Sequence, residues 1–255
     1  IKINWVMTER SNFQAYNVHG IQHQLRKFLS KKSSLIIANS EIGYHNWHNL
    51  KRSKVIKIEN AVDILKIRSF KKKEDPEKNF SLVYAGSCIE SKNIETLIKA
   101  VSIVSKKIDI FLYIIGGGPL ERNLKELVNN LKLNNNVIFK SFSLDWWKYL
   151  NHSNIFVSMS LIEGMPNVLL EAIASETITI ISDIGAHREL IDEDSTFFIP
   201  PKNEIKLAAT ILEVLKNLDH YQYKVDNASC IIADFTVTKI FSKYHQKYTK
   251  LLSIN

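Results

Sequence analysis

From about residue 80 onward, short uninterrupted apolar runs alternate with segments whose apolar residues recur at helical spacing. Runs such as FSLVYAG (80–86) and NIFVSMS (154–160) are apolar on both faces of a strand, which is typical of parallel sheets covered by helices on both sides. Strands are predicted at 80–86, 110–116, 136–142, 154–160, 177–183 and 195–200, and helices at 92–106, 120–133, 146–153, 169–175, 185–191 and 204–217. The sequence therefore predicts a doubly wound α/β domain, which binds ligands at the carboxyl ends of its strands.

The first 75 residues carry a shorter version of the same pattern. Strands are predicted at 33–40 and 54–63 and a helix at 18–32, which is about half of a second α/β domain. The segment KKKEDPEKN (71–79) is predicted to be a linker. We therefore divide the chain into a partial N-terminal portion with its linker, a C-terminal domain and a last helix that packs back on the N-terminal portion. Their bounds are 1–75, 76–235 and 236–255.

Charge is unevenly distributed along the chain. Residues 1–75 contain 15 Lys and Arg against 6 Asp and Glu, whereas the remaining 180 residues sum to −1. This basic third favours an anionic neighbour, such as a phospholipid surface or a phosphorylated substrate, or else forms a solvated lysine-rich face. Nucleic acid is disfavoured because no nucleic-acid-reading motif accompanies the charge.

Targeting signals and cysteine frameworks are not indicated by the sequence. It has no run of eighteen apolar residues, and its first residues are charged too early for a signal peptide. Cys88 and Cys230 match no disulfide or zinc spacing, so a reducing cytosol is the expected setting. His19 and His23 are four residues apart, but the rest of a metal-ligand set is missing and no metal is expected.

The glycine run IIGGGPLERN follows a strand and precedes a helix. A GxGxxG fingerprint beginning at Gly116 would need glycine where Glu121 stands, and no GxxxxGK[ST] loop occurs. Hydride transfer to a dinucleotide is thus weakly supported. A tight strand–helix turn and a ligand contact both remain open for these glycines.

The stretch SLIEGMPNVLLEA (160–172) places two carboxylates around a predicted helix start. Pro166 suits the first helical turn, where free N–H groups attract phosphate. Glu171 lies five residues further, about 7–8 Å along the axis, and its side chain leans back toward the helix start. Such a carboxylate can accept hydrogen bonds from both hydroxyls of a ribose. Glu163 would then face the group that the phosphate carries, and Lys92, at the start of another helix, suits the phosphate itself.

This stretch resembles the Glu-x7-Glu motif of retaining, nucleotide-sugar-dependent glycosyltransferases of group 1, which have the GT-B architecture of two Rossmann-like domains. LVYAGSCIESKNIETLIKAV, LYIIGGGPLERNLKEL and SDIGAHRELI also follow that family in order and spacing, so that the resemblance covers about residues 33–250. It implies a nucleoside-diphosphate sugar as the donor and a glycan or lipid-linked acceptor. It also implies that no metal is required.

The family pattern assigns roles residue by residue. The resemblance implies that Glu163 and Lys92 are catalytic, and that the donor is bound by Glu171, Gly86, Ser87, Gly164, Met165, Pro166, Asn167, Val168, Ser141 and Phe142. Many members carry an arginine after the first loop glycine, where this chain has Ser87 and Cys88. One phosphate contact is therefore either lost or supplied by Arg122 or Arg188. Trp146 and Trp147 are interpreted as packing residues, and Glu189 as a first-turn helix glutamate stabilised by its own helix dipole.

We therefore expect a cytoplasmic glycosyltransferase of polysaccharide biosynthesis, with room for peripheral contact with an anionic membrane at its inner face. The first half of the family's N-terminal domain is not seen, so the chain is either a fragment or an unusually short enzyme. Two alternatives remain open: a nucleotide-sugar epimerase of the same architecture, and a non-catalytic nucleotide-binding module.

Overall fold

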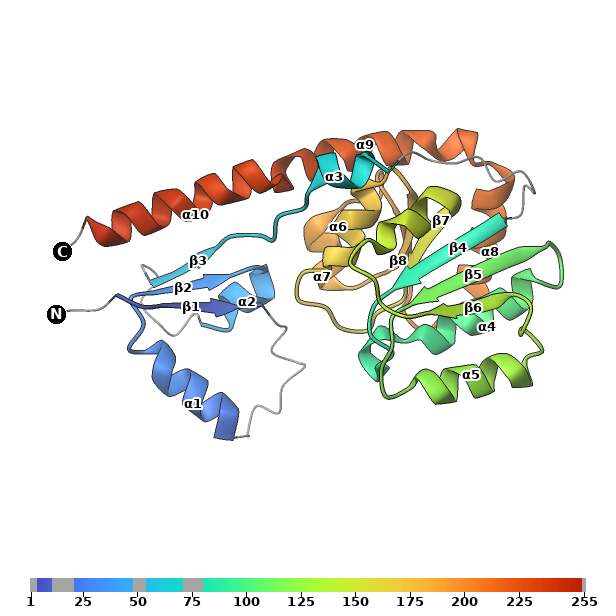
Figure 1. The fold of residues 1–255 in the computed structure, drawn as a ribbon, viewed down its shortest axis with the longest axis horizontal. Coiled ribbons are helices and arrows are strands. Elements are labelled where there is room, and N and C mark those ends of the chain that lie inside the picture. Colours follow the sequence, from blue (N-terminus) through green and yellow to red (C-terminus); the bar gives the residue numbers. More distant parts are fainter. Residues whose placement is uncertain (1–3, 11–20, 48–53, 71–79, 254–255) are drawn as a thin grey trace.

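The computed structural model describes residues 4–10, 21–47, 54–70 and 80–253, which form two parallel β-sheets and a long C-terminal helix (Figure 1). The strands are β1 (Val6–Glu9), β2 (Leu35–Ala38), β3 (Val55–Lys57), β4 (Phe80–Ala85), β5 (Ile110–Ile115), β6 (Val137–Lys140), β7 (Ile155–Ser158), β8 (Ile178–Ser182) and β9 (Phe197–Ile199). The α-helices are α1 (Ile21–Ser30), α2 (Glu41–His45), α3 (Ile64–Arg68), α4 (Ile94–Val104), α5 (Glu121–Asn130), α6 (Asn167–Ala174), α7 (Gly185–Leu190), α8 (Glu204–Lys216), α9 (Gln222–Ile232) and α10 (Val237–Leu252). Two 3-10 helices, η3 (Glu90–Lys92) and η4 (Trp146–His152), matter for the site.

The larger sheet has six parallel strands in the order β6-β5-β4-β7-β8-β9. The chain builds outward from β4 to β6 and then returns to the other side of β4 with β7. Connections after β4 and β7 therefore leave the sheet in opposite directions and open a crevice at its carboxyl edge. This order confirms the predicted doubly wound α/β class. It also places the segments that follow β4 and β7, which carry Lys92 and Glu163, at the same crevice.

Alternate residues of the central strands point to opposite faces of the sheet and belong to two separate hydrophobic cores. On β4, Leu82 and Tyr84 pack with residues of α4, α5 and α8, whereas Val83 and Ala85 pack with residues of η4, α6 and α9. All four side chains are at most 4% exposed. The continuous apolar runs of the sequence thus reflect strands buried on both faces, and the two helical layers are visible on either side of the sheet in Figure 1.

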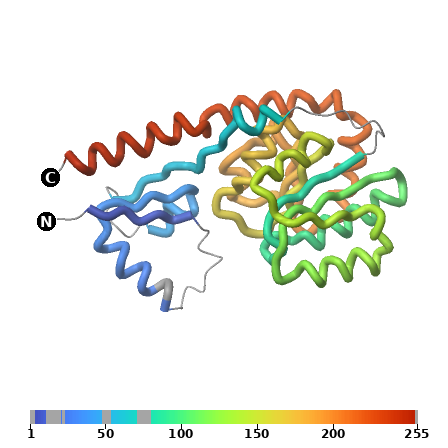
Figure 2. Tube along the Cα trace, viewed as in Figure 1, coloured from blue at the N-terminus to red at the C-terminus, as the bar shows by residue number. Residues whose placement is uncertain are grey.

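The smaller sheet consists of β1, β2 and β3 in that order, also parallel. Leu35, Ile37 and Ile58 on one face pack against Ile240 of α10, which runs back from the larger sheet along the smaller one (Figure 2). Trp47 packs against the other face. The bounds predicted for the N-terminal portion, the C-terminal domain and the last helix stay predictions. The predicted linker, residues 71–79, lies outside the described part of the chain.

The carboxyl ends of the two sheets face each other (Figure 1). Asn60, which follows β3, bridges them: its backbone N–H donates to Met165 Sδ at 3.0 Å and its Nδ2 donates to Asn167 Oδ1 at 2.6 Å. A small cavity of about 50 Å³ lies at this junction, lined by Asn39 and Lys57 on one side and by Met165 on the other. The crevice of the larger sheet is therefore covered in part by the smaller one.

Two loops cross at the carboxyl edge so closely that only glycine fits. Gly116 has a φ of +138°, and a Cβ there would lie 2.1 Å from the carbonyl oxygen of Gly86. Gly118 has a φ of +155°, and its Cβ would lie 2.8 Å from the carbonyl oxygen of Cys88. The glycine run is thus explained by tight backbone crossing beneath the segment that carries Gly86.

We expect Gly116→Ala to lower the free energy of unfolding by more than about 2 kcal/mol, because it adds a positive-φ penalty to an overlap with backbone. Gly185 is the matched control, since a Cβ there meets nothing within 4 Å and its φ is not in the left-handed region. Gly185→Ala should leave stability within about 0.5 kcal/mol of wild type. Urea unfolding of both variants measures the difference, and equal stabilities would contradict the crossing.

Candidate functional site at the carboxyl edge of the larger sheet

Lys92 is held at the carboxyl end of β4 by the residue that follows it. Lys92 ends η3, and Asn93 takes a left-handed backbone conformation with a φ of 49°. The side chain of Asn93 donates to the carbonyl oxygens of Met159 at 3.0 Å and Pro201 at 2.6 Å. Asn93 therefore fixes the backbone of Lys92 beside the end of β7, a role that the sequence alone did not indicate.

Glu163 lies in the loop between β7 and α6 and is 9% exposed. Its Oε1 lies 2.6 Å from Lys92 Nζ and accepts a hydrogen bond from Ser160 Oγ at 2.7 Å. A shielded carboxylate stays ionised only when such partners surround it. The structure thus brings together the two residues expected to be catalytic, while their roles stay predictions.

Pro166 is the N-cap of α6, with φ −82° and ψ 89°, and not a first-turn residue as predicted from the sequence. The prediction was wrong by one position because a ψ of 89° lies outside the helical region. The Pro166 carbonyl accepts from the N–H groups of Leu169 and Leu170, at 3.1 and 3.3 Å. The first helical residues, Asn167 and Val168, bring their backbone N–H groups to a helix start with no side-chain cap, which suits an anion.

Glu171 lies one turn into α6 and accepts a hydrogen bond from Trp146 Nε1 at 2.5 Å. Burial raises the pKa of Glu171 above its ordinary value, and the hydrogen bond from Trp146 acts in the opposite direction. Trp146 and Trp147 are 3% and 9% exposed, which agrees with the packing role predicted for them. The indole that orients Glu171 comes from η4, 25 residues earlier, and no sequence signal pointed to it.

The other expected donor-binding residues lie along the same edge. Gly86 has a φ of +149° beneath Tyr84, whose hydroxyl donates to the carbonyl oxygen of Ser87 at 3.3 Å. Ser141 and Phe142 follow β6, and the Phe142 side chain is 67% exposed. These residues follow β4 and β6 at the carboxyl edge of the sheet, and their contacts with a donor stay predictions.

Residues 164–168 connect this edge to the smaller sheet. Gly164 and Met165 line the 50 Å³ cavity, and Met165 and Asn167 accept the hydrogen bonds from Asn60. Val168 is half-buried against the core of α6. The loop expected to hold the donor is therefore supported from both sheets.

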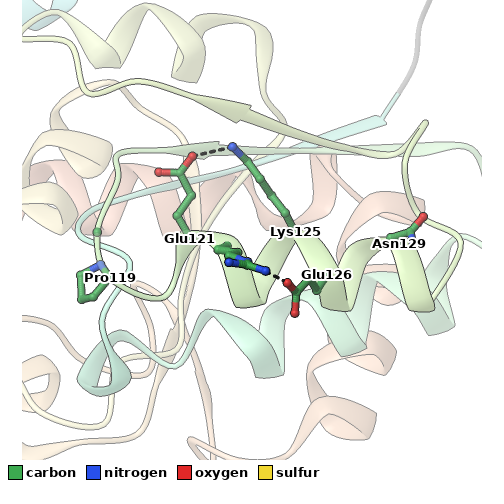
Figure 3. A pocket seen from close by; sticks show the side chains of 7 residues that line it. Pro119, Glu121, Lys125, Glu126 and Asn129 are labelled. Carbon is green, nitrogen blue, oxygen red and sulfur yellow. Dashed lines mark hydrogen bonds and ion pairs between the residues drawn. The ribbon is translucent and has the colours of Figure 1, made fainter.

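The two arginines considered as phosphate ligands are both engaged by carboxylates. Arg188 lies 2.5 Å from Asp183 and 2.9 Å from Glu193, whereas Arg122 lies 3.0 Å from Glu126. Arg122 belongs to an open hollow of about 590 Å³ along α5, whose charged side chains pair along the helix (Figure 3). That hollow is a solvated helix face, and its charges are already neutralised in pairs.

Glu189 does not sit in the first turn of its helix, which corrects the interpretation drawn from the sequence. It is the fifth of the six residues of α7, and its two carboxylate oxygens accept from the backbone N–H of Glu41 at 2.8 and 2.9 Å. Lys57 Nζ lies 3.2 Å from Glu189 Oε1. Glu189 therefore caps the start of α2, which follows β2 of the smaller sheet, and does not interact with the start of its own helix. His19 and the side chain of His23 lie outside the described residues.

Comparison with known proteins identifies the family. The sequence model of "Glycosyl transferases group 1" matches residues 66–229, and the chain belongs to this family. It is 32% identical over 168 residues to an uncharacterized glycosyltransferase of Methanocaldococcus jannaschii, an alignment that covers 62% of this chain and 41% of the relative. It is 28% identical over 194 residues to an N-acetylgalactosamine-N,N'-diacetylbacillosaminyl-diphospho-undecaprenol 4-alpha-N-acetylgalactosaminyltransferase of Campylobacter jejuni, covering 74% of this chain and 51% of the relative.

The fold is that of the GT-B glycosyltransferases. The crystal structure of Anabaena HepE in complex with UDP and glucose superposes with a TM-score of 0.83 at 20% identity, covering 96% of this chain and 71% of HepE. The chain spans about half the length of the two relatives named above. Among the residues described, no helix is long and apolar enough to cross a membrane, and no group of three acidic, His or Cys side chains is placed to hold a metal ion.

We predict that Glu171→Gln raises the melting temperature at pH 7.5 by a few degrees. Because burial raises the pKa of Glu171 in the folded state, keeping it ionised costs stability at any pH above both its folded and unfolded pKa values. The gain should shrink as the pH falls toward the ordinary value of 4.5, where the carboxyl is protonated. Glu95→Gln on the exposed face of α4 is the control and should show no such pH-dependent gain. Thermal scans between pH 4.5 and 8 decide, and a destabilised Gln variant at pH 7.5 would count against the buried-carboxylate account.

Proposed function

We propose that this chain binds a nucleoside-diphosphate sugar at the crevice between β4 and β7 and transfers the sugar, with retention of configuration, to a glycan or lipid-linked acceptor. The observation that carries the proposal is the Lys92–Glu163 pair beside the uncapped start of α6, with Glu171 one turn away. Family membership supports sugar transfer, and HepE, a neighbour in fold, was crystallised with UDP and glucose.

The diphosphate would lie at the start of α6. The free N–H groups of Asn167 and Val168 and the positive end of the helix dipole favour negative charge there. Lys92 Nζ pairs with Glu163 at the same edge of the sheet. It would supply a full positive charge to the departing nucleoside diphosphate. Charge developing on the leaving group is thus stabilised by fixed donors, which is the main source of rate enhancement proposed for this site. We propose that no metal is needed for this step.

The two glutamates would bind the two ends of the donor, Glu171 the ribose and Glu163 the sugar. Glu171, which accepts a hydrogen bond from Trp146, would also accept hydrogen bonds from the two ribose hydroxyls. Glu163 would face the sugar. The acceptor hydroxyl would attack the anomeric carbon from the face that the diphosphate leaves, and it would pass its proton to the departing phosphate oxygen as the carbon–oxygen bond to the diphosphate breaks. Ser141 and Phe142, which follow β6, would lie beside the nucleobase.

The acceptor side is proposed to lie on the smaller sheet. The carboxyl ends of β1, β2 and β3 face the crevice, and residues 1–75 hold the basic excess of the chain. We propose a cytoplasmic location with peripheral contact between these basic residues and an anionic membrane. The C. jejuni relative is named for transfer to a diphospho-undecaprenol-linked sugar, which supports a lipid-linked acceptor.

Calorimetric titration with UDP, GDP, ADP and CMP tests the donor site. We expect one nucleotide to bind, and Glu171→Ala to weaken that binding by about 10-fold or more, as expected when buried hydrogen bonds to a carboxylate are lost. The matched control is Glu95→Ala, since Glu95 is a solvent-exposed glutamate that pairs with Lys99 on α4.

Further measurements on the same proteins check the fold of the variant and the two alternative functions. Circular dichroism of Glu171→Ala should match wild type, so that lost affinity reports on the site. No binding by wild type, or unchanged affinity in Glu171→Ala, would overturn the assignment. Conversion of the sugar nucleotide without any acceptor would indicate the epimerase reading instead, and binding without turnover over a panel of acceptors would indicate a binding module.

A further inference from the structure

A chain of buried polar groups runs behind Glu163, from the loop after β7 to the first turn of α7. Ser160 Oγ donates to Glu163 Oε1 at 2.7 Å, and the carbonyl oxygen of Ser160 accepts from Ser182 Oγ at 2.6 Å. The carbonyl oxygen of Ser182 in turn lies 2.7 Å from His187 Nδ1. Ser160, Ser182 and His187 are all fully shielded from solvent.

The protonation state of His187 follows from its partner. A carbonyl oxygen can only accept, so Nδ1 must carry the proton that the hydrogen bond needs. Burial lowers the pKa of His187, so the ring is neutral at physiological pH with a bare lone pair on Nε2, which has no hydrogen-bond partner. A neutral ring of fixed tautomer orients Ser182 without placing a second cation beside Lys92.

We propose that Ser160, Ser182 and His187 form a positioning relay that holds the Glu163 carboxylate in the orientation required by the donor sugar. The relay rests on the proposed function, because Glu163 is the residue assigned to the sugar. None of the three contacts the donor in this proposal; each acts through the next, and Ser160 acts on Glu163 directly.

The relay answers a problem that the ion pair creates. In this structure Glu163 is paired with Lys92, but a bound diphosphate would attract Lys92 to itself. Glu163 would then lose a cationic partner at the moment when it must face the sugar. The hydroxyl of Ser160 does not depend on Lys92, because it is anchored through the Ser160 main chain to Ser182 on the neighbouring strand β8. It therefore keeps the carboxylate in place during the exchange.

The relay makes a specific prediction about binding. Removing the Ser160 hydroxyl should weaken the binding of the sugar part of the donor. The contacts with the nucleotide, at Glu171 and the start of α6, should stay intact. We expect the ratio of the dissociation constants of sugar nucleotide and free nucleotide to rise about tenfold in Ser160→Ala, as for the loss of one hydrogen bond to a charged group. The affinity for the free nucleotide should stay within twofold of wild type. A purely structural defect would weaken both ligands together.

The matched control is Ser158→Ala, which removes a buried hydroxyl two residues earlier whose hydrogen bond to Ser160 Oγ is long, at 3.4 Å, and therefore weak. Calorimetry would use UDP with UDP-glucose, UDP-galactose and their N-acetylated counterparts, or the corresponding sugars of whichever nucleotide binds. The ratio should stay at the wild-type value in Ser158→Ala and rise part of the way in His187→Leu. An unchanged ratio in Ser160→Ala, or an equal change in Ser158→Ala, would overturn the relay and leave the donor site standing.

Two further outcomes separate the relay from the proposed function. If the wild-type protein binds a nucleotide but none of the corresponding nucleotide sugars, the role of Glu163 is contradicted, and with it both proposals. The relay also has a test without any ligand: nitrogen-15 NMR of the histidine rings in wild type should show His187 neutral with the proton on Nδ1. A proton on Nε2 would break the hydrogen bond to Ser182 and overturn the relay directly.

Discussion

The pairing of a shielded carboxylate is the constraint on which this site depends. Glu163 is about nine-tenths buried, and an ionised group in such a place is tolerated only with partners close at hand. Its partners come from two segments: Lys92 from the segment after β4, and Ser160 from the segment after β7. Meeting both requirements at once needs the loops after β4 and β7 to converge. They do so because the strand order reverses between these two strands.

Much of the surrounding structure holds these two loops in fixed positions relative to each other. Asn93 joins the Lys92 segment to Met159, and the backbone N–H of Leu161 donates to the carbonyl oxygen of Ser91 at 2.7 Å. Beneath them, Gly86 and Gly116 cross at a distance that no side chain would allow. These loops are joined by backbone hydrogen bonds and by the side chain of Asn93, so the charged groups need not hold the loops themselves. Catalytic groups placed on such a scaffold can exchange partners without the scaffold moving.

The larger sheet could be predicted from the sequence because strands buried on both faces leave an unambiguous apolar signature, as β4 shows. The short helices α2 and α3 were missed because five residues are too few to show a period. In the site, Lys92, Glu163 and Glu171 were indicated by motif and by their position after strands. Trp146, Asn93 and His187 were not indicated, because their partners lie between 5 and 108 residues away and only the folded chain brings them together. Glu189 was misread for the same reason: its partner is the backbone N–H of Glu41 at the start of α2, 148 residues earlier in the chain.

The contacts between the two sheets suggest how the crevice and its cover act together. Asn60 holds Met165 and Asn167, which flank the start of α6, and Glu189 with Lys57 holds the start of α2. Both sets of contacts are polar. They surround a cavity that is large enough to hold a water molecule, so the two sheets are not joined by a close-packed apolar interface. Interfaces of this kind allow two units to shift relative to each other at little cost. A donor bound at α6 as proposed would touch the same loop that Asn60 contacts, so its binding and the position of the smaller sheet would be linked through Met165 and Asn167. If the acceptor binds on the smaller sheet as proposed, it would respond to the donor through contacts already present in the chain.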